Sequence, residues 1–286
     1  MREVGTGRER IIVLLGYPLG HSLSPALHNA SFRAQNLPFV YRPYPVPPDD
    51  IGSAIRQLKD AGFAGANVTV PHKRSVLQYL DATSEIVAAV GAANTLVWKP
   101  GPFGGELYGD NTDVGGFLAT LQNSLWIEMP CVILGSGGAA RAVAFGMLTS
   151  TSAPVITVAA RNPGRVQSLV GSLSGYDTGG RLRALAITDA GPSIRDAGLI
   201  VNATPVGMHP RVDDSPWPEP GDFHRGQLAY DLIYNPSETR FMREAQKAGA
   251  QSMGGLEMLI QQAALSYRQW TETPMDIEAA RAALNP

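Results

Sequence analysis

One stretch constrains the fold more than any other: the run from Cys131 to Arg141, which reads CVILGSGGAAR. Its apolar first part predicts a buried strand, and the run from Ala139 to Leu148 predicts a helix. Between them stands the pattern Gly135-x-Gly137-x-x-Ala140. A strand, a glycine turn of this spacing and a helix are typical of a dinucleotide-binding unit. The glycines admit a tight turn and a close approach of a pyrophosphate to the backbone, and the alanine lets helix and strand pack closely.

The turn and the start of the helix form the predicted phosphate site, because helix N-termini offer N–H groups to anions. The residues expected to contact the cofactor there are Gly135, Ser136, Gly137, Gly138 and Ala139. A Gly-rich turn that binds nothing is the alternative interpretation.

The residues after the next predicted strand, 155–160, indicate which dinucleotide binds. A carboxylate roughly 20 residues beyond the glycines would hold the ribose hydroxyl of NAD. This chain instead has Arg161 and Asn162, with Arg165 close behind, and no acidic residue in the run. Guanidinium groups suit a phosphate, so the sequence predicts NADP, with Arg161 and Asn162 as contacts. Ordinary surface arginines are the alternative.

Composition narrows the class of partner. The chain has 286 residues, of which 44% are hydrophobic, and a net charge of -2. This length suits two domains, and the charge gives no reason to expect nucleic acid or an anionic membrane as partner, so a small molecule is expected. Cys131 is the single cysteine, which excludes an intrachain disulfide and a cysteine-based metal cluster. The charged beginning and the lack of a long apolar stretch predict a soluble, cytoplasmic protein.

Strands and helices alternate along the first half of the chain. Strands are predicted at 11–16, 39–46, 65–70 and 92–98, and helices from Ser24-Pro25, at 50–61, 81–90 and 114–121. Ser24 is the expected N-cap, with Pro25 at the first helical position. Such alternation predicts an α/β fold with mostly parallel strands, whose ligands collect beyond the carboxyl ends of the strands. Thr69 and Lys73 fall at such an end.

The second half continues the same pattern. Helices are predicted at 163–173, after Ser237-Glu-Thr and at 256–270, and strands at 199–204 and 228–234, the latter as the last strand. The turn from Gly101 to Gly105 has no functional account. The histidines His21, His28 and His72 show no ligand spacing, so no metal is expected.

Together the segments resemble the shikimate dehydrogenase family along nearly the whole chain. The matching stretches are GxPxxHSxSPxxHN from Gly16, NVTVPHK from Asn67, GAxNTL from Gly91, GDNTD from Gly109, GSGGA from Gly135, NATxxGM from Asn202, YDxxYxP from Tyr230 and GLxMLxxQA from Gly255. The resemblance implies an N-terminal α/β substrate domain at 1–112 and a Rossmann-type NADP domain at 113–253. It also implies C-terminal helices at 254–286 that return to the first domain.

The same resemblance implies a reaction and a set of site residues. The family reversibly reduces 3-dehydroshikimate to shikimate with NADPH, a step of aromatic amino-acid biosynthesis. Lys73 and Asp113 are implied to be catalytic, and Thr204 and Gly255 to contact the cofactor. The residues implied to bind substrate are Ser22 and Ser24, at its carboxylate, and Thr69, Asn94, Tyr234 and Gln262, around its ring.

Two alternatives stay open. A quinate or aminoshikimate dehydrogenase of broader specificity would share most of these motifs. A non-catalytic NADP-binding regulatory protein would keep the fold but would not need Lys73 together with Asp113. The family often has Asn-Arg-Thr where this chain has Ala160-Arg161-Asn162, which predicts a looser preference for NADP. A monomer and a homodimer are equally compatible with the sequence.

Overall fold

A computed structural model describes residues 9–99 and 105–284, and these divide into two compact units. Unit 1 comprises the residues up to Ala88, the segment Ala92–Thr112 and the residues from Ala263 onward. Unit 2 comprises Ala89–Gly91 and Asp113–Gln262. Each unit has its own sheet and its own core, which is the α/β architecture expected from the sequence. Most of the Gly101–Gly105 turn lies outside the described residues.

Unit 1 is built on a mixed sheet of strand order β2-β1-β3-β5-β6-β4. Strand β1 pairs parallel with β2 and β3, whereas β5 runs antiparallel to both β3 and β6. The bounds are β1 (Arg10–Gly16), β2 (Phe39–Pro45), β3 (Gly65–Val68), β4 (Ala82–Thr83), β5 (Thr95–Lys99) and β6 (Glu106–Asp110).

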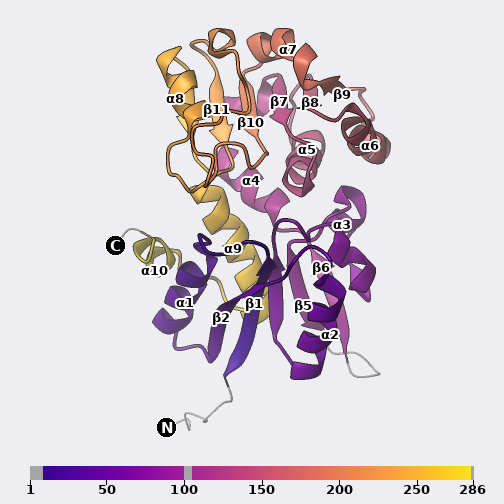
Figure 1. Ribbon diagram of the computed structural model, residues 1–286, viewed down its shortest axis with the longest axis vertical. Helices are drawn as coiled ribbons and strands as arrows, with labels where there is room; N and C mark the ends of the chain where they lie inside the picture. Colours follow the sequence, from indigo (N-terminus) through magenta and orange to yellow (C-terminus); the bar gives the residue numbers. More distant parts are fainter. Residues whose placement is uncertain (1–8, 100–104, 285–286) are drawn as a thin grey trace. The chain divides into compact units, whose positions relative to one another are not determined.

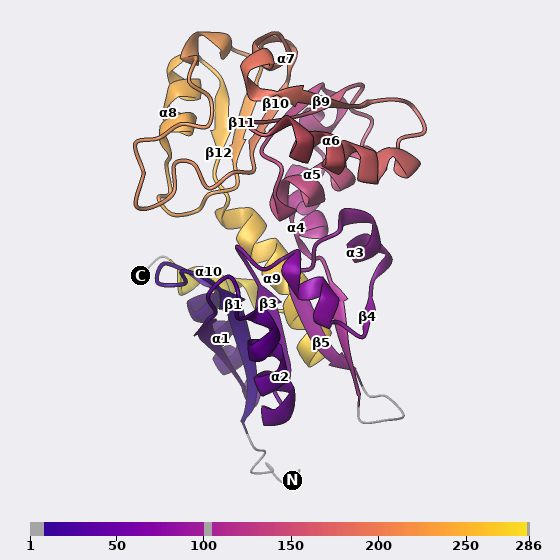
Figure 2. The same ribbon diagram turned by 45° about the vertical axis from the view of Figure 1, so that its right-hand side comes forward.

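Helices cover both faces of this sheet (Figures 1 and 2). One face carries α2 (Ile51–Ala61) and the 3-10 turn η1 (Ser75–Tyr79), whose apolar side chains pack on Val13 and Leu15. The other face carries α1 (Ser24–Ala34), α10 (Ile277–Ala282) and the last turns of α9 (Leu256–Thr271). Trp270 ties α9 to the sheet, since its indole N–H donates to the Leu96 carbonyl at 2.9 Å.

Two predictions in unit 1 were wrong. The helix expected at 81–90 begins only at Glu85, as α3 (Glu85–Val90), because the Asp81 carboxylate accepts from the Leu107 N–H at 2.8 Å and draws the preceding residues to the edge of the sheet. Ser24 does not cap α1. It is the first helical residue, and its own N–H donates to the Ser22 hydroxyl at 3.3 Å.

Unit 2 is a doubly wound parallel sheet of strand order β12-β11-β10-β7-β8-β9. This is the strand order of the dinucleotide-binding fold, which confirms the predicted fold class. The bounds are β7 (Cys131–Leu134), β8 (Ile156–Ala160), β9 (Leu182–Ala186), β10 (Leu199–Asn202), β11 (Leu228–Asp231) and β12 (Gln251–Met253). The strands β9 and β12 were not predicted, and β11 is therefore not the last strand.

Each face of the second sheet has its own apolar core. Alternate residues of β7 point to opposite faces, so that Ile133 packs under one helical layer and Val132 under the other. The first layer contains α4 (Asp113–Leu121), α5 (Gly138–Ser150) and α6 (Pro163–Leu173), and the second contains α7 (Gly191–Asp196) and α8 (Arg240–Lys247). Shorter 3-10 turns are η2 (Leu125–Glu128), η3 (Ser174–Tyr176), η4 (Ile187–Asp189) and η5 (Pro220–Asp222).

Strands β10 and β11 end earlier than predicted because their last side chains capture the backbone. The Asn202 side-chain oxygen accepts from the Thr204 N–H at 3.0 Å, and the Asp231 carboxylate accepts from the Ile233 N–H at 3.0 Å. Both turns direct the chain into loops at the carboxyl edge of the sheet. No helix in the part of the chain that the structure describes is long and apolar enough to cross a lipid bilayer.

Candidate active site

In the glycine turn after β7, each small residue is required or tolerated for a different structural reason. Gly135 has a φ of +123°, and a Cβ there would lie 3.0 Å from the Ala203 carbonyl oxygen, so the backbone requires glycine. Ala140 is fully buried where α5 meets the sheet. A Cβ on Gly137 would meet no described atom within 4 Å. Packing therefore does not require a glycine at position 137, and the open space beside its backbone leaves room for a ligand to approach.

The turn lies where the strand order reverses, between β7 and its neighbour β10, which is where open α/β sheets bind their ligands. The first N–H groups of α5 have no acceptor within the helix and suit an anion. Thr204 lies in the loop after β10, where its hydroxyl donates to Asn202 Oδ1 at 2.7 Å and accepts from the Val206 N–H at 3.1 Å. The loop is thus held in one conformation beside Gly135.

Arg161 and Asn162 follow β8, and both side chains are exposed. The Asn162 carboxamide oxygen accepts from the Arg165 N–H at 3.1 Å and so caps α6. Part of Asn162 is therefore engaged in capping a helix, a role that the sequence had not predicted for it. The guanidinium groups of Arg161 and Arg165 are both exposed near this helix start. The glycine turn and these arginines together fit the charge and backbone requirements of NADP.

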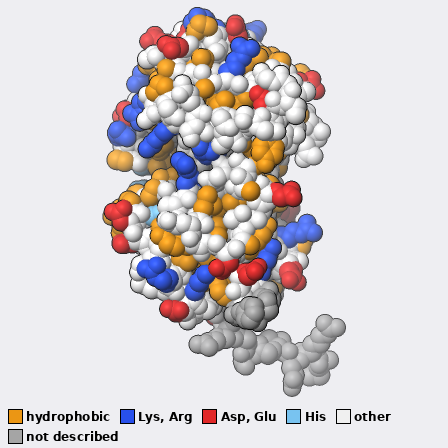
Figure 3. All heavy atoms as spheres, turned by 90° about the vertical axis from the view of Figure 1, so that its right-hand side faces the viewer, with side chains coloured by type: hydrophobic (Ala, Val, Ile, Leu, Met, Phe, Trp, Pro, Cys, Tyr) orange, Lys and Arg blue, Asp and Glu red, His pale blue; other side chains and the backbone are white. Residues whose placement is uncertain are grey.

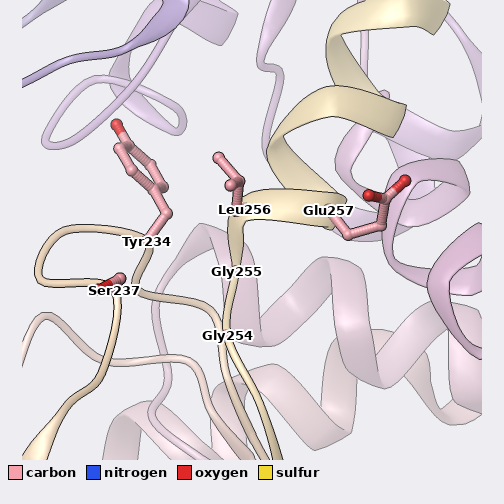
Figure 4. A pocket seen from close by; sticks show the side chains of 6 residues that line it. All are labelled: Tyr234, Ser237, Gly254, Gly255, Leu256 and Glu257. Carbon is pink, nitrogen blue, oxygen red and sulfur yellow. The ribbon is translucent and has the colours of Figure 1, made fainter. Parts of the chain in front are cut away.

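A pocket of about 330 Å³ opens after the carboxyl ends of β11 and β12, at the same edge of the sheet as the glycine turn. It is lined by Tyr234, Ser237, Gly254, Gly255, Leu256 and Glu257 (Figure 4). It brings together two predicted residues, Tyr234 and Gly255. Gly255 cannot carry a side chain, because a Cβ would overlap the Leu232 carbonyl group. Ser237 and Glu257 were not predicted, since their types and positions are typical of an ordinary helix start and helix surface.

Asp113 and Gln262 also belong to unit 2. Asp113 is the first residue of α4 and is only 5% exposed. Gln262 lies on α9, where its amide donates to the Leu259 carbonyl at 2.8 Å. Helices α4 and α9 approach each other closely at Gly116 of α4, where a Cβ would lie 2.8 Å from the Gln262 backbone nitrogen. A glycine at this position therefore sets the place of Gln262.

In unit 1 the predicted residues follow the carboxyl ends of β1 and β3. Ser22 and Ser24 form one turn, linked by the hydrogen bond described above. Thr69 and Lys73 flank a turn in which the His72 N–H donates to the Thr69 carbonyl at 2.8 Å. The Lys73 carbonyl accepts from the Ala93 N–H at 2.8 Å, which fixes the backbone of this half-buried lysine next to the segment that leads through Asn94 into β5.

Asn94 is 2% exposed and immediately precedes β5. Its side-chain oxygen accepts from the Thr112 N–H at 2.8 Å. This contact fixes the orientation of the carboxamide. The side chains that surround it, from Asn67, Thr95, Thr112 and Ser266, were not predicted as part of the site.

Comparison with known proteins connects this arrangement to a family. Residues 14–96 match the family model described as the shikimate dehydrogenase substrate binding domain, and residues 255–284 match that of the shikimate 5'-dehydrogenase C-terminal domain. The chain is 45% identical over 279 residues to shikimate dehydrogenase (NADP(+)) of Salinibacter ruber, covering 96% of each chain. The chain belongs to the shikimate dehydrogenase family.

Solved members of the shikimate dehydrogenase family share the whole architecture. Shikimate 5-dehydrogenase from Thermus thermophilus, solved with NADP(H) and shikimate, superimposes with a TM-score of 0.81 at 35% identity, covering 96% of this chain and 99% of that one. A quinate dehydrogenase from Corynebacterium glutamicum, solved with NAD, has a TM-score of 0.86 at 28% identity, covering 98% and 99%. The structural similarity thus includes both a protein solved with shikimate and NADP(H) and a quinate dehydrogenase solved with NAD.

Proposed function

We propose that this chain catalyses the reversible NADPH-dependent reduction of 3-dehydroshikimate to shikimate, a step of aromatic amino-acid biosynthesis. The observation that carries the proposal is the 45% identity, over 96% of both chains, to a shikimate dehydrogenase (NADP(+)). The residue types agree with it. The glycine turn and the arginines of unit 2 suit a phosphorylated dinucleotide, and the hydroxyl groups and the lysine of unit 1 suit a small polyhydroxylated acid.

Unit 2 would bind NADPH, and the bound cofactor would supply the hydride to the substrate carbonyl. Gly135, Gly137 and the N-terminus of α5 bind the pyrophosphate, and Arg161 binds the 2′-phosphate. Side chains of both charges lie on the face of the molecule drawn in Figure 3, and the net charge of the chain is -2. We therefore assign the selection of NADP to a local contact at Arg161.

The substrate is bound as an anion with several hydroxyl groups. Ser22 and Ser24 bind its carboxylate, as hydroxyl groups beside the start of α1. The residues that the resemblance to the family implies as partners of its ring hydroxyls all offer hydrogen bonds: Thr69, Asn94, Tyr234 and Gln262. With the residues assigned in this way, the site fits a ligand that has a carboxylate at one end and hydroxyl groups at the other.

Lys73 and Asp113 perform the acid–base chemistry. Reduction of a ketone develops negative charge on its oxygen, and the Lys73 ammonium stabilises that charge and donates the proton. Asp113 is the second catalytic residue that the resemblance to the family implies. In the reverse direction Lys73 accepts the proton from the alcohol.

The proposal is tested by incubating purified protein with 3-dehydroshikimate and NADPH and identifying the product by NMR. We expect stoichiometric formation of shikimate and NADP. A protein that binds NADPH but forms no product would contradict the proposal and would favour a regulatory role.

A second candidate is oxidation of quinate with NAD. It is favoured by the likeness to the Corynebacterium glutamicum quinate dehydrogenase. The absence of an acidic residue between positions 155 and 165 argues against it, since no carboxylate there can hold the ribose hydroxyl of NAD.

The remaining expectations are part of the same proposal. We propose that residues 1–112 bind the substrate, that 113–253 bind the cofactor and that 254–286 complete the first domain. The protein acts in the cytoplasm as a monomer or a homodimer. Sedimentation velocity at micromolar concentration distinguishes the two assemblies.

A further inference from the structure

We infer that Ser266, a fully buried residue of α9, is a positioning residue that holds the Asn94 carboxamide with its oxygen turned into the protein. Asn94 then meets its ligand as a hydrogen-bond donor through Nδ2. Ser266 lies outside the motifs that carry the family resemblance. The inference rests on the proposed function for the identity of the ligand, and on unit 1 alone for its geometry.

The first observation is that the chain itself supplies donors to the Asn94 oxygen. The Thr112 N–H donates to Oδ1 at 2.8 Å and the Thr95 hydroxyl donates at 3.0 Å. The Thr112 hydroxyl lies farther away, at 3.2 Å. A carboxamide oxygen has two lone pairs, so the two closer donors saturate it. A ligand hydroxyl that approaches Asn94 must therefore act as acceptor.

The second observation is a closed circuit of hydrogen bonds. Asn94 Nδ2 donates to the Thr112 hydroxyl at 3.0 Å. The Ser266 hydroxyl lies 3.1 Å from that of Thr112 and 2.8 Å from that of Thr95. Thr95 returns the circuit to Asn94 Oδ1. The hydroxyls of Thr95 and Thr112 also lie 3.2 Å from each other, and the shorter contacts of 2.8 and 3.1 Å run through Ser266.

Counting protons gives the circuit a direction. Each hydroxyl has one proton to donate. Because Thr95 donates to Asn94, the contacts are consistent with a circuit in which Thr95 accepts from Ser266 and Ser266 accepts from Thr112. In this direction each of the three hydroxyls donates to the next group of the circuit. A flipped Asn94 carboxamide would place its NH₂ group against the Thr112 N–H and would break the sequence of donors.

The surroundings keep the circuit rigid. Asn67 Nδ2 donates to Ser266 at 3.1 Å and to the Asn94 carbonyl at 3.0 Å, and Asn67 Oδ1 accepts from the Tyr41 hydroxyl at 2.8 Å. Every member is buried, so water does not compete for these bonds, and the low local dielectric strengthens them. Loss of one hydroxyl should therefore affect the orientation of Asn94 more than the stability of the fold.

The test compares Ser266→Ala with Ser31→Ala in the full-length protein. Ser31 is an equally buried serine of unit 1, whose hydroxyl accepts from the Asp276 N–H at 2.9 Å and lies outside the circuit. We expect Ser266→Ala to raise the KM for shikimate about fivefold or more, the size of one lost hydrogen bond. The KM for NADP should stay unchanged, and Ser31→Ala should change neither constant.

A second readout does not depend on activity. In ¹⁵N-labelled protein without ligands, the Asn94 side-chain signals are assigned through their loss in Asn94→Asp. Their hydrogen exchange should be about tenfold faster in Ser266→Ala, because the circuit is opened, and unchanged in Ser31→Ala. A wild-type protein inactive on shikimate would refute the proposed function, while the exchange rates would still decide the circuit. A Ser266→Ala protein with wild-type Asn94 exchange would overturn the inference, as would an unchanged KM for shikimate in an active enzyme.

Discussion

His28 stacks on Tyr41 with ring centroids 4.4 Å apart and ring planes 11° from parallel. The imidazole is fully buried, and neither of its nitrogens has a hydrogen-bond partner among the described residues. Burial lowers the pKa of His28 from 6.5 to about 3. The imidazole therefore occupies an aromatic layer of unit 1 as a neutral ring.

This burial predicts a loss of stability in acid. The unfolded chain binds a proton at His28 below about pH 6.5, whereas the folded chain does not, so the stabilisation is complete above that pH and falls as the pH decreases. Between pH 6.5 and pH 5 the loss is about 2 kcal/mol. His28→Phe should remove this part of the pH dependence in urea unfolding. An unchanged slope in the variant would show that His28 ionises in the folded protein.

Asp231 should have the opposite pH dependence. Burial raises its pKa to about 6, although the Thr239 hydroxyl, the Ile233 N–H and the Asn202 amide all donate to it. The folded chain therefore binds this proton more readily than the unfolded chain, and stability decreases as the pH rises from about 4 to 6. The effect is at most about 3 kcal/mol. In Asp231→Asn, unfolding curves across this range should lack the decrease, and a decrease equal to that of the wild type would contradict the assignment.

Lys73→Ala should lower kcat by roughly a hundredfold or more, because the proton donor to the reacting oxygen is lost. The control is Lys59→Ala, which removes a lysine of unit 1 that pairs with Asp81 at 3.1 Å at the surface. Steady-state rates and melting temperatures of both variants separate catalysis from folding. Near wild-type turnover in a folded Lys73→Ala protein would exclude Lys73 as the acid.

Arg161→Ala should raise the KM for NADP far more than the KM for NAD, because only NADP carries the 2′-phosphate. Arg183→Ala provides the matched control, since it removes an exposed arginine from β9 of the same unit. Initial rates with both cofactors measure the ratio directly. Equal effects on the two cofactors would refute the phosphate contact.

Local signals in the sequence predicted most of the fold. Helix α6 begins and ends where it was expected, at Pro163 and Leu173, because a proline at the first position and an apolar period define it. The strands that were missed include β6 and β9, which have five residues each; β6 begins and ends with an acidic residue, and β9 is interrupted by Arg183. Their existence depends on pairing with neighbours, which local pattern does not encode.

Site residues could be predicted where they lie together in one continuous stretch of sequence. The glycine turn and the segment around Lys73 could be identified because each is a continuous stretch. Ser266 could not, because it meets Thr95 across 171 positions of sequence. Ser237 and Glu257 likewise could not be predicted, because the pocket that they line forms only when separate segments of unit 2 meet.

The most direct test of the central claim is the initial rate of cofactor reduction with shikimate or quinate, each paired with NADP or NAD. The account predicts strong turnover with shikimate and NADP, and much weaker turnover in the other three pairings. Preferred turnover of quinate with NAD would contradict the assigned substrate and cofactor. No turnover in any pairing, with NADP still bound, would contradict the proposal that the protein is an enzyme of this reaction.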